Sequence, residues 1–321
     1  MPPALRAIME LTDYDFGIAA IDSGYGRPRL NAIHLIVEGD RAALVDTGVN
    51  SSVPRVLAAL AAKGLAPEQV EYVFLTHVHL DHAGGAGELM RHLPRARLTV
   101  HPRGARHMAD PSRLLAGTVA VYGEAATRKI YGTVIPVAPE RIVETPEGTV
   151  LALGQREFRF LETPGHARHH VAIVDGRSGH VFTGDTFGLS YRELDCGGRQ
   201  FVIPTTSPVQ FDPAAAIRSV ERIAALAPPA IYVTHYSQVR DIPRLASDMR
   251  RLIEAHAALA HAARDAGAGR AERLRAGVER IVLEEARRQG WALRDDEILA
   301  VLGGDIELNA QGLACWLDAA A

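Results

Sequence analysis

The chain has 321 residues, enough for two domains or for one large domain with an appendage. Its 47% hydrophobic and 23% charged residues and formal net charge of -3 are typical of a soluble globular protein, without the basic excess that would indicate nucleic acid as a partner. The two cysteines, Cys196 and Cys315, are far apart and form no C-x-x-C pair, which argues against a disulfide framework or a thiolate zinc site and favours a reducing compartment.

The N-terminal stretch, residues 1–16, contains Glu10, Asp13 and Asp15 and lacks the apolar core of a secretory signal. No later stretch approaches about 18 uninterrupted apolar residues, the length of a membrane-spanning helix. We therefore expect a cytoplasmic protein without a membrane partner.

Short strands separated by helices are predicted from about residue 16 to residue 184. Residues 32–38 and 42–46 are apolar runs separated by Gly39-Asp40, which predicts a hairpin. A helix follows from about Val53 to Gly64, and then a strand at 73–76, a helix at 83–93 and a strand at 96–101. Residues 103–131 are expected to form an irregular helical insertion that either covers a site or protects a sheet edge.

A second run of antiparallel strands is predicted at residues 141–144, 149–153, 157–162, 171–175 and 180–183. A helix from Pro213 to about Leu226 leads to a last strand at 230–234, and the apolar spacing beyond Asp241 is helical, with shorter helices near 297–302 and 308–317. We expect residues 1–240 to form one domain and residues 241–321 a helical C-terminal subdomain, an arrangement compatible with a homodimer.

The segment T-H-V-H-L-D-H at 76–82 places four side chains of the kinds that bind metals within six residues, where a predicted strand ends and a helix begins. Such a turn directs alternate side chains into one cavity, so that His77 and His79 can share one ion while Asp81 and His82 point toward a second. A carboxylate beside imidazoles suits a hydrolytic metal. The isolated histidines are interpreted as core or surface residues: His34, His92, His101, His107, His180, His256 and His261.

Three further motifs follow in order, T-P-G-H at 163–166, T-G-D-T at 183–186 and T-H at 234–235, each at the end of a predicted strand. The same sheet edge would therefore collect His166, Asp185 and His235. Strand ends hold side chains rigidly and leave them accessible, so we expect a metal site at this edge.

Together with L-V-D-T-G at 44–48, T-H-V-H-L-D-H-A-G-G at 76–85 and F-T-G-D-T at 182–186, these motifs make residues 16–240 resemble the metallo-β-lactamase superfamily, and more closely its glyoxalase II-like hydrolases. The resemblance implies an α+β fold, the αββα sandwich known as the metallo-β-lactamase fold, here with a C-terminal helical appendage. It also implies two divalent metal ions as cofactors, with zinc expected and iron or manganese as alternatives.

Carried over residue by residue, the resemblance implies that His77, His79 and His166 bind one ion. Asp81, His82 and His235 would bind the other, and Asp185 would bridge both. Asp81 and Asp185 are the candidate catalytic residues, Asp81 as the group that accepts or relays a proton. Asp46 resembles the family's carboxylate that orients the metal ligands. The sequence is equally compatible with Asp46 as an ordinary turn residue that precedes a helix. His170 matches the second histidine of the TPGHxxGH pattern, but His169 replaces the glycine before it, which leaves the role of His170 open.

The activity that the resemblance implies is that of a binuclear metal-dependent hydrolase, in which a metal-bridging hydroxide attacks a thioester or lactone/ester carbonyl of a small-molecule substrate. One alternative is a persulfide dioxygenase with a single iron. A phosphodiesterase of the same fold is disfavoured because no basic surface is indicated, and a diiron flavoprotein-like module because it has glutamate at the position of His79. Five aromatic residues near the ligands or in the insertion could contact the substrate, but core packing is the expected role of each: Tyr122, Tyr131, Phe187, Tyr191 and Tyr236.

Overall fold

A computed structural model describes residues 10–319, which form two compact units. The first unit contains the chain through Glu162 together with His169–Gly184 and Thr234–Ser237, and the second contains Thr163–Arg168, Asp185–Val233 and the chain from Gln238 onward. The first nine residues of the N-terminal stretch considered above lie outside the described part. Between residues 10 and 319, no helix is both long and apolar enough to cross a membrane.

A seven-stranded sheet with the order β1-β2-β3-β4-β5-β6-β7 organises the first unit. Strands β1 to β4 pair antiparallel and β4 to β7 pair parallel. The expected hairpin is present, and its turn contains Gly39 at a φ of 60°, a conformation that glycine adopts without strain. The strands are β1 (Leu11–Asp13), β2 (Ile18–Asp22), β3 (Ala32–Glu38), β4 (Arg41–Val45), β5 (Val70–Phe74), β6 (Arg97–Val100) and β7 (Ile142–Glu144).

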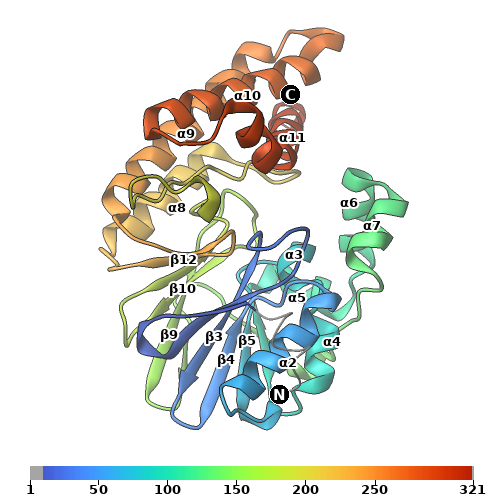
Figure 1. Ribbon diagram of the computed structural model, residues 1–321. Helices are drawn as coiled ribbons and strands as arrows, with labels where there is room; N and C mark the ends of the chain where they lie inside the picture. The colour runs from blue at the N-terminus through green and yellow to red at the C-terminus, as the bar shows by residue number, and fades with distance from the viewer. Residues whose placement is uncertain (1–9, 320–321) are drawn as a thin grey trace. The chain divides into compact units, whose positions relative to one another are not determined.

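Helices α2 (Val53–Ala62) and α4 (Ala86–His92) cover one face of this sheet (Figure 1) and bury an apolar core that includes Val56 and Leu89. The single helix expected at 83–93 is in fact two, α3 (Leu80–Ala83) and α4, separated by Gly84 and Gly85. A side chain at Gly85 would lie 2.8 Å from the carbonyl oxygen of Val49, so glycine permits this close approach. Because of this break, the axis of α3 does not have to continue that of α4.

The second sheet of the first unit contains β8 (Val150–Leu153), β9 (Arg156–Glu162), β10 (Val171–Asp175) and β11 (Val181–Gly184), paired antiparallel in that order as expected. Phe74 of β5 contacts Phe158 and Phe160 of β9, with ring centroids 5.2 and 5.4 Å apart. The two sheets therefore pack face to face around an aromatic core.

The segment expected as an irregular helical insertion contains three helices, α5 (Pro102–Ala109), α6 (Ser112–Tyr122) and α7 (Glu124–Tyr131). No residue of α6 is buried, whereas Tyr131 at the end of α7 is 3% exposed and packs with Val49 and Leu80. The end of the insertion thus lies against the first turn of α3.

The second unit is mainly helical and contains α8 (Pro213–Ala225), β12 (Ile231–Val233), α9 (Ile242–Ala263), α10 (Arg270–Gln289) and α11 (Asp295–Ala319), while β13 (Ser237–Val239) begins at the last residue of the first unit. The two short helices expected near 297–302 and 308–317 form one continuous α11. Gly303 and Gly304 indicate a break there, but Ile298, Leu302 and Ile306 keep a helical spacing and are buried, so packing overrides the low helix propensity of glycine.

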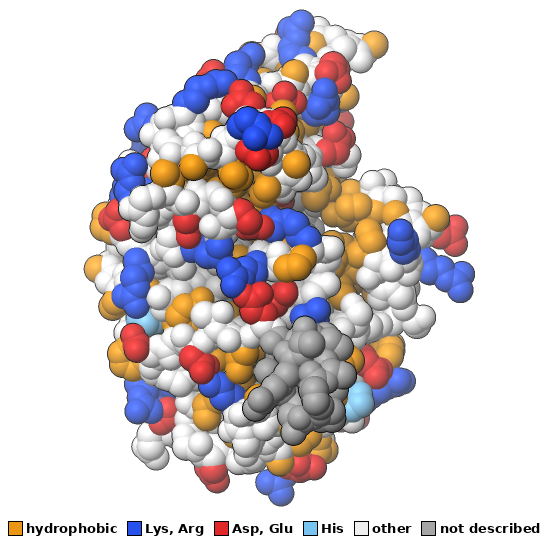
Figure 2. Space-filling model, viewed as in Figure 1, with side chains coloured by type: hydrophobic (Ala, Val, Ile, Leu, Met, Phe, Trp, Pro, Cys, Tyr) orange, Lys and Arg blue, Asp and Glu red, His pale blue; other side chains and the backbone are white. Residues whose placement is uncertain are grey.

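Charged side chains link the long helices of the second unit. Arg251 of α9 lies 2.7 Å from Glu285 of α10 and 3.0 Å from Asp248. Figure 2 shows one face of the molecule, on which basic and acidic side chains are interspersed. Short 3₁₀ turns occur at Asp15–Gly17, Asn50–Ser52, Pro67–Gln69, Pro139–Arg141, Arg192–Leu194 and Gly267–Gly269.

Candidate metal centre

The loop between β5 and α3 carries four of the expected ligands in the first unit. His77 and His79 lie on the loop itself, and Asp81 and His82 lie in the first turn of α3. The backbone N–H groups of His82 and Ala83 both donate to the carbonyl oxygen of His79, which fixes the start of the helix. His77 and His82 are both fully buried. Their burial shows that this segment is not a solvated turn.

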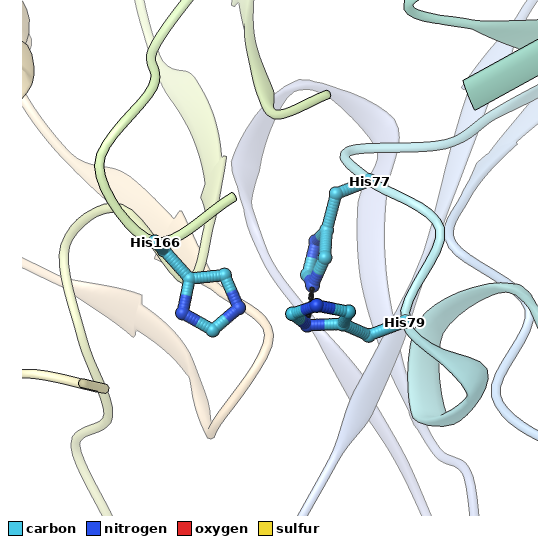
Figure 3. Close-up of side chains that lie close together, drawn as sticks. All are labelled: His77, His79 and His166. Atoms are coloured by element: carbon cyan, nitrogen blue, oxygen red, sulfur yellow. Dashed lines mark hydrogen bonds between the residues drawn. The ribbon is translucent and has the colours of Figure 1, made fainter. Parts of the chain in front are cut away.

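The rings of His77 and His79 meet edge to face, with Nε2 of His77 3.0 Å from Nδ1 of His79 (Figure 3). The other nitrogen of His77, Nδ1, lies 3.1 Å from the hydroxyl of Thr76. That hydroxyl lies 3.0 Å from both carboxylate oxygens of Asp46 and donates its proton to them. The hydroxyl therefore accepts from the Nδ1–H of His77, so Nε2 of the neutral ring carries a lone pair.

Asp46 holds the neighbouring segments together from the D-T-G turn after β4. It has a φ of 60°, in the left-handed region that aspartate tolerates better than most residues. Its carboxylate accepts from the N–H of Thr76 at 2.9 Å, from Nδ1 of His82 at 2.8 Å and from the hydroxyl of Thr234 at 3.0 Å. In the neutral ring of His82 the proton is thus on Nδ1 and the lone pair on Nε2.

His235, in the segment after β12, lies beside Asp81 and His82. Its Nδ1 lies 2.8 Å from the backbone carbonyl of Leu30, which can only accept, so this nitrogen carries the proton. The Nε2 atoms of His235 and His82 each lie 3.4 Å from Oδ2 of Asp81. One ligand atom from each of Asp81, His82 and His235 lies within 4.8 Å of the others.

These separations fit a metal ion. Two atoms bound to one tetrahedral zinc at about 2.0 to 2.2 Å lie about 3.3 to 3.6 Å apart, and both separations from Asp81 fall in that range. The separation between His77 and His79 is a few tenths of an ångström shorter. The first unit therefore contains one complete group of two imidazoles and a carboxylate, and one pair of imidazoles beside it.

The carboxyl of Asp81 is suited to remain ionised. Burial raises its pKa, but in the metal-free protein the charge of protonated His82 and hydrogen bonds from the protonated rings of His235 and His82 outweigh burial and hold the pKa well below its usual range. The side chain is about 20% exposed to solvent. An ionised carboxylate is the form that binds a metal ion.

The other two expected ligands belong to the second unit. His166 comes four residues after β9, and Asp185 directly follows β11. Nδ1 of His166 lies 3.2 Å from the carbonyl oxygen of Thr205, so its Nε2 carries the lone pair, and this atom lies 3.5 Å from Oδ2 of Asp185. The hydroxyl of Thr205 also donates to the carbonyl of Asp185 at 3.1 Å. This pair is again spaced for a shared ion.

Two histidines that the motifs left open flank the loop after β5. The ring of His170 stacks on His77 with centroids 4.9 Å apart, and Nδ1 of His169 lies 3.5 Å from the N–H of Val78. His169 therefore contacts the backbone between two expected ligands, a role that sequence reasoning missed. The sequence feature that could have indicated this contact is the position of His169 close to the T-P-G-H motif.

The isolated histidines divide between core and surface. His34, His101, His180 and His256 are buried, and burial lowers the pKa of His34 to about 3 and of His256 to about 4. The side chain of His92 is 45% exposed. Of the five aromatic residues expected in the core, four are buried and Tyr122 is 38% exposed. Tyr122 lies on α6, which buries none of its residues.

Comparison with known proteins identifies the family. Residues 26–235 match the family model described as the metallo-beta-lactamase superfamily. A hydroxyacylglutathione hydrolase from Xanthomonas campestris pv. campestris is 33% identical over 193 residues, which cover 60% of this chain and 54% of that protein. The chain thus spans about half the length of the hydroxyacylglutathione hydrolases that it matches.

Two solved structures share the fold. A metallo-beta-lactamase superfamily protein from Sulfolobus tokodaii superposes with a TM-score of 0.64 and 22% identity, covering 93% of this chain and 98% of that one. A metallo-beta-lactamase family protein from Thermus thermophilus gives 0.63 and 21%, covering 94% and 93%. The expected αββα fold with additional C-terminal helices is confirmed. The chain belongs to the metallo-beta-lactamase superfamily.

Proposed function

We propose that the protein is a binuclear metal-dependent hydrolase that cleaves a thioester or a lactone/ester carbonyl of a small-molecule substrate. The observation that carries the proposal is the tautomer of four histidines, His77, His82, His166 and His235. Each donates through Nδ1 to an oxygen acceptor and keeps the lone pair on Nε2. A hydrogen bond that fixes the tautomer in this way is characteristic of histidines that bind metals.

The proposed ligand sets follow the expected order. His77, His79 and His166 would hold one ion, Asp81, His82 and His235 the other, and Asp185 would bridge the two. The separations within each unit support this assignment: three of the four measured pairs lie 3.4 to 3.5 Å apart, as expected for ligands of one ion, and the pair His77 and His79 lies closer, at 3.0 Å. In this proposal residues 1–240 supply the catalytic domain and residues 241–321 a helical subdomain.

When bound, two divalent ions supply an activated water and polarise a carbonyl oxygen. The residues of the chain would hold those ions in place and transfer the proton released from the water. Asp81 keeps its carboxylate ionised, the form that would hold an ion, and its partial exposure would let it relay a proton to solvent rather than retain it. Asp46 fixes His82 and, through Thr76, His77, which keeps both rings in the form that binds metal.

The thioester or lactone class is supported by the relatives named hydroxyacylglutathione hydrolase. Because the aligned region covers about half of those proteins, their substrate is not carried over. The proposal is therefore limited to an activated acyl carbonyl, the group that such hydrolases attack.

The test combines metal content with activity on a panel of thioesters and lactones. We expect about two equivalents of metal, with zinc as the natural candidate, and hydrolysis that is lost on chelation and restored on reloading. His235→Asn is expected to lower metal content and to abolish turnover, whereas His92→Asn, at an exposed histidine, retains both. Two bound ions without hydrolysis of any member of the panel would contradict the proposed substrate class.

One observation favours a second candidate. Asp81, His82 and His235 form a set of two histidines and a carboxylate, which is also used by mononuclear iron oxygenases. A protein that purifies with one iron and consumes oxygen in the presence of a persulfide would be a dioxygenase. The same metal determination therefore separates the two functions.

A further inference from the structure

Two tyrosines lie near the candidate ligand Asp81 in the first unit. Tyr25 belongs to the loop between β2 and β3, and Tyr131 is the last residue of α7 in the insertion. Their rings stack with centroids 6.1 Å apart, and their hydroxyl oxygens are 3.1 Å apart. The loop and the insertion thus meet at a hydrogen-bonded pair of phenols, which we call the tyrosine pair.

The loop that carries Tyr25 is attached to the candidate metal centre at two points. The side-chain amide of Asn31 donates to the backbone carbonyl of Asp81 at 2.9 Å. The carbonyl of Leu30 accepts from Nδ1 of His235 at 2.8 Å. The position of the loop is therefore coupled to the positions of two candidate ligands.

Tyr131 is held from the other side of the pair. Its side chain is buried and packs with Leu80, the residue that precedes Asp81. Two residues beyond Tyr131, the carbonyl of Thr133 accepts from the side-chain amide of Asn50 at 2.7 Å, which fixes the end of the insertion. Both partners of the tyrosine pair are therefore in place before a ligand binds.

The tyrosine pair has one hydroxyl proton that it does not use. Among residues 10–319, the two hydroxyls hydrogen bond to each other and to no further group. Each phenol can donate one proton and accept another, so their single bond uses one of the two O–H groups. Tyr25 is partly exposed and Tyr131 is buried. If Tyr131 donates within the pair, the second O–H belongs to the ring that a ligand can reach.

The hydroxyls of the pair remain protonated at neutral pH. Burial raises the pKa of both tyrosines, and the negative charge of Asp81 raises it further. Burial is the larger cause, and it does not depend on the charge of the metal centre. The pair is therefore a hydrogen-bond donor to an electron-rich oxygen and does not act as a base.

We propose that the hydroxyl of Tyr25 donates a hydrogen bond to the acyl carbonyl oxygen of the substrate, and that Tyr131 positions this hydroxyl by donating to it. The inference rests on the proposed function, in which the acyl carbonyl binds beside Asp81. Negative charge develops on the carbonyl oxygen as water attacks, so a fixed donor stabilises the transition state more than the bound substrate. Its loss should therefore lower kcat more than it raises KM.

The experiment measures kinetics and ligand binding on the zinc-loaded protein. We determine kcat and KM for an acetyl thioester and a γ-lactone. Affinity for methylphosphonate, whose charged oxygens resemble those of the tetrahedral intermediate, is measured by calorimetry. Tyr25→Phe is expected to lower kcat by about a hundred- to a thousandfold with little change in KM. The same variant should bind methylphosphonate about ten- to a hundredfold more weakly and keep its zinc content.

A second variant tests the positioning role. Tyr131→Phe leaves the hydroxyl of Tyr25 but removes the bond that orients it, so kcat should fall by about two- to tenfold, the value of one neutral hydrogen bond. The double variant should be no slower than Tyr25→Phe, because Tyr131 acts through Tyr25. The matched control is Tyr72→Phe, at a tyrosine of β5 whose ring stacks on Phe74. The control is expected to retain kcat, KM and affinity.

Tyrosine absorption gives a readout that does not depend on turnover. A phenol whose hydroxyl gains a charged acceptor changes its absorption spectrum. Methylphosphonate should therefore produce a tyrosine difference spectrum in the wild-type protein and in Tyr72→Phe. The same spectrum should be absent in Tyr25→Phe, and its persistence there would assign the contact to another tyrosine and overturn the inference.

The outcomes separate this inference from the proposed function. Efficient hydrolysis with the same kcat in Tyr25→Phe and Tyr72→Phe would overturn the hydrogen bond and leave the hydrolase intact. Losses that add in the double variant would overturn the positioning role of Tyr131. Methylphosphonate binding that depends on Tyr25, in a protein that hydrolyses neither substrate, would retain the donor and refute the hydrolase.

Discussion

Asp46→Asn is the substitution that most directly tests how the candidate metal centre is held. The carboxylate accepts at both oxygens: Oδ1 accepts from the N–H and hydroxyl of Thr76, and Oδ2 accepts from Nδ1 of His82 and the hydroxyls of Thr76 and Thr234. Asparagine has the same shape but replaces one acceptor with a donor. In either orientation its amide nitrogen faces an N–H group, of Thr76 or of His82.

The two orientations have different costs. With the amide nitrogen toward His82, the ring relieves the conflict by moving its proton to Nε2, and it then no longer offers a lone pair to the metal. With the amide nitrogen toward Thr76, the buried N–H of Thr76 loses its acceptor. A hydrogen bond to a charged group contributes about 1.5 to 3 kcal/mol, so we expect metal affinity to fall by about ten- to a hundredfold.

The assay is competition for zinc against a chromophoric chelator, with thermal unfolding of the metal-free protein in parallel. Asp175→Asn is the control, because Asp175 is a fully buried aspartate of the same unit that is paired with Arg156 instead of a histidine. We expect the control to lose stability and keep its metal affinity. A folded Asp46→Asn protein with wild-type zinc affinity would refute the role assigned to Asp46.

Three further predictions concern stability. Arg156→Met is expected to cost about 3 to 5 kcal/mol in urea unfolding because it leaves the carboxylate of Asp175 buried without its bidentate partner. Arg156→Met combined with Asp175→Leu should recover most of this loss, and a double variant no more stable than the single one would contradict the explanation. The pKa values of His34 and His256, lowered by burial to about 3 and about 4, mean that the unfolded chain binds more protons below about pH 6.5. Stability should therefore be full above that pH and should fall toward pH 4 by up to roughly 1.4 kcal/mol per pH unit for each histidine. His256→Leu should remove about half of that slope, and an unchanged slope would exclude the histidine as its cause. Finally, chelation should lower the melting temperature and zinc should restore it, with about 4 kcal/mol gained at a thousandfold excess over Kd; equal melting temperatures with and without metal would indicate that the folded chain binds none.

Much of the fold follows from the sequence because its strands have clear boundaries. Gly39 marks the hairpin turn, and β3 begins and ends where the apolar run does. The motifs could be placed at strand ends because each begins at or near the end of an apolar run, as Asp185 follows β11. Periodicity and turn chemistry are local properties, and a single sequence records them well.

Other features depend on contacts that no local pattern records. Continuity of α11 across Gly303 and Gly304 follows from side chains that pack elsewhere in the second unit. The tautomer of His235 is set by the carbonyl of Leu30, a residue with no chemical signal of its own in the sequence. The tyrosine pair joins Tyr25 and Tyr131, which are 106 positions apart in the chain, and no local pattern relates them.

The contact between Asp46 and Thr234, 188 positions apart in the chain, has a consequence for biosynthesis. A ribosome that has translated the T-H-V-H-L-D-H loop has produced four candidate ligands, but Thr234 and His235 do not yet exist. The nascent chain can hold a metal at the loop only weakly, because one ligand of the group formed by Asp81, His82 and His235 is still missing. In the proposed centre, stable metal uptake would therefore follow synthesis of residue 235, and a chain released earlier would hold metal too weakly to compete with the cell's own chelators.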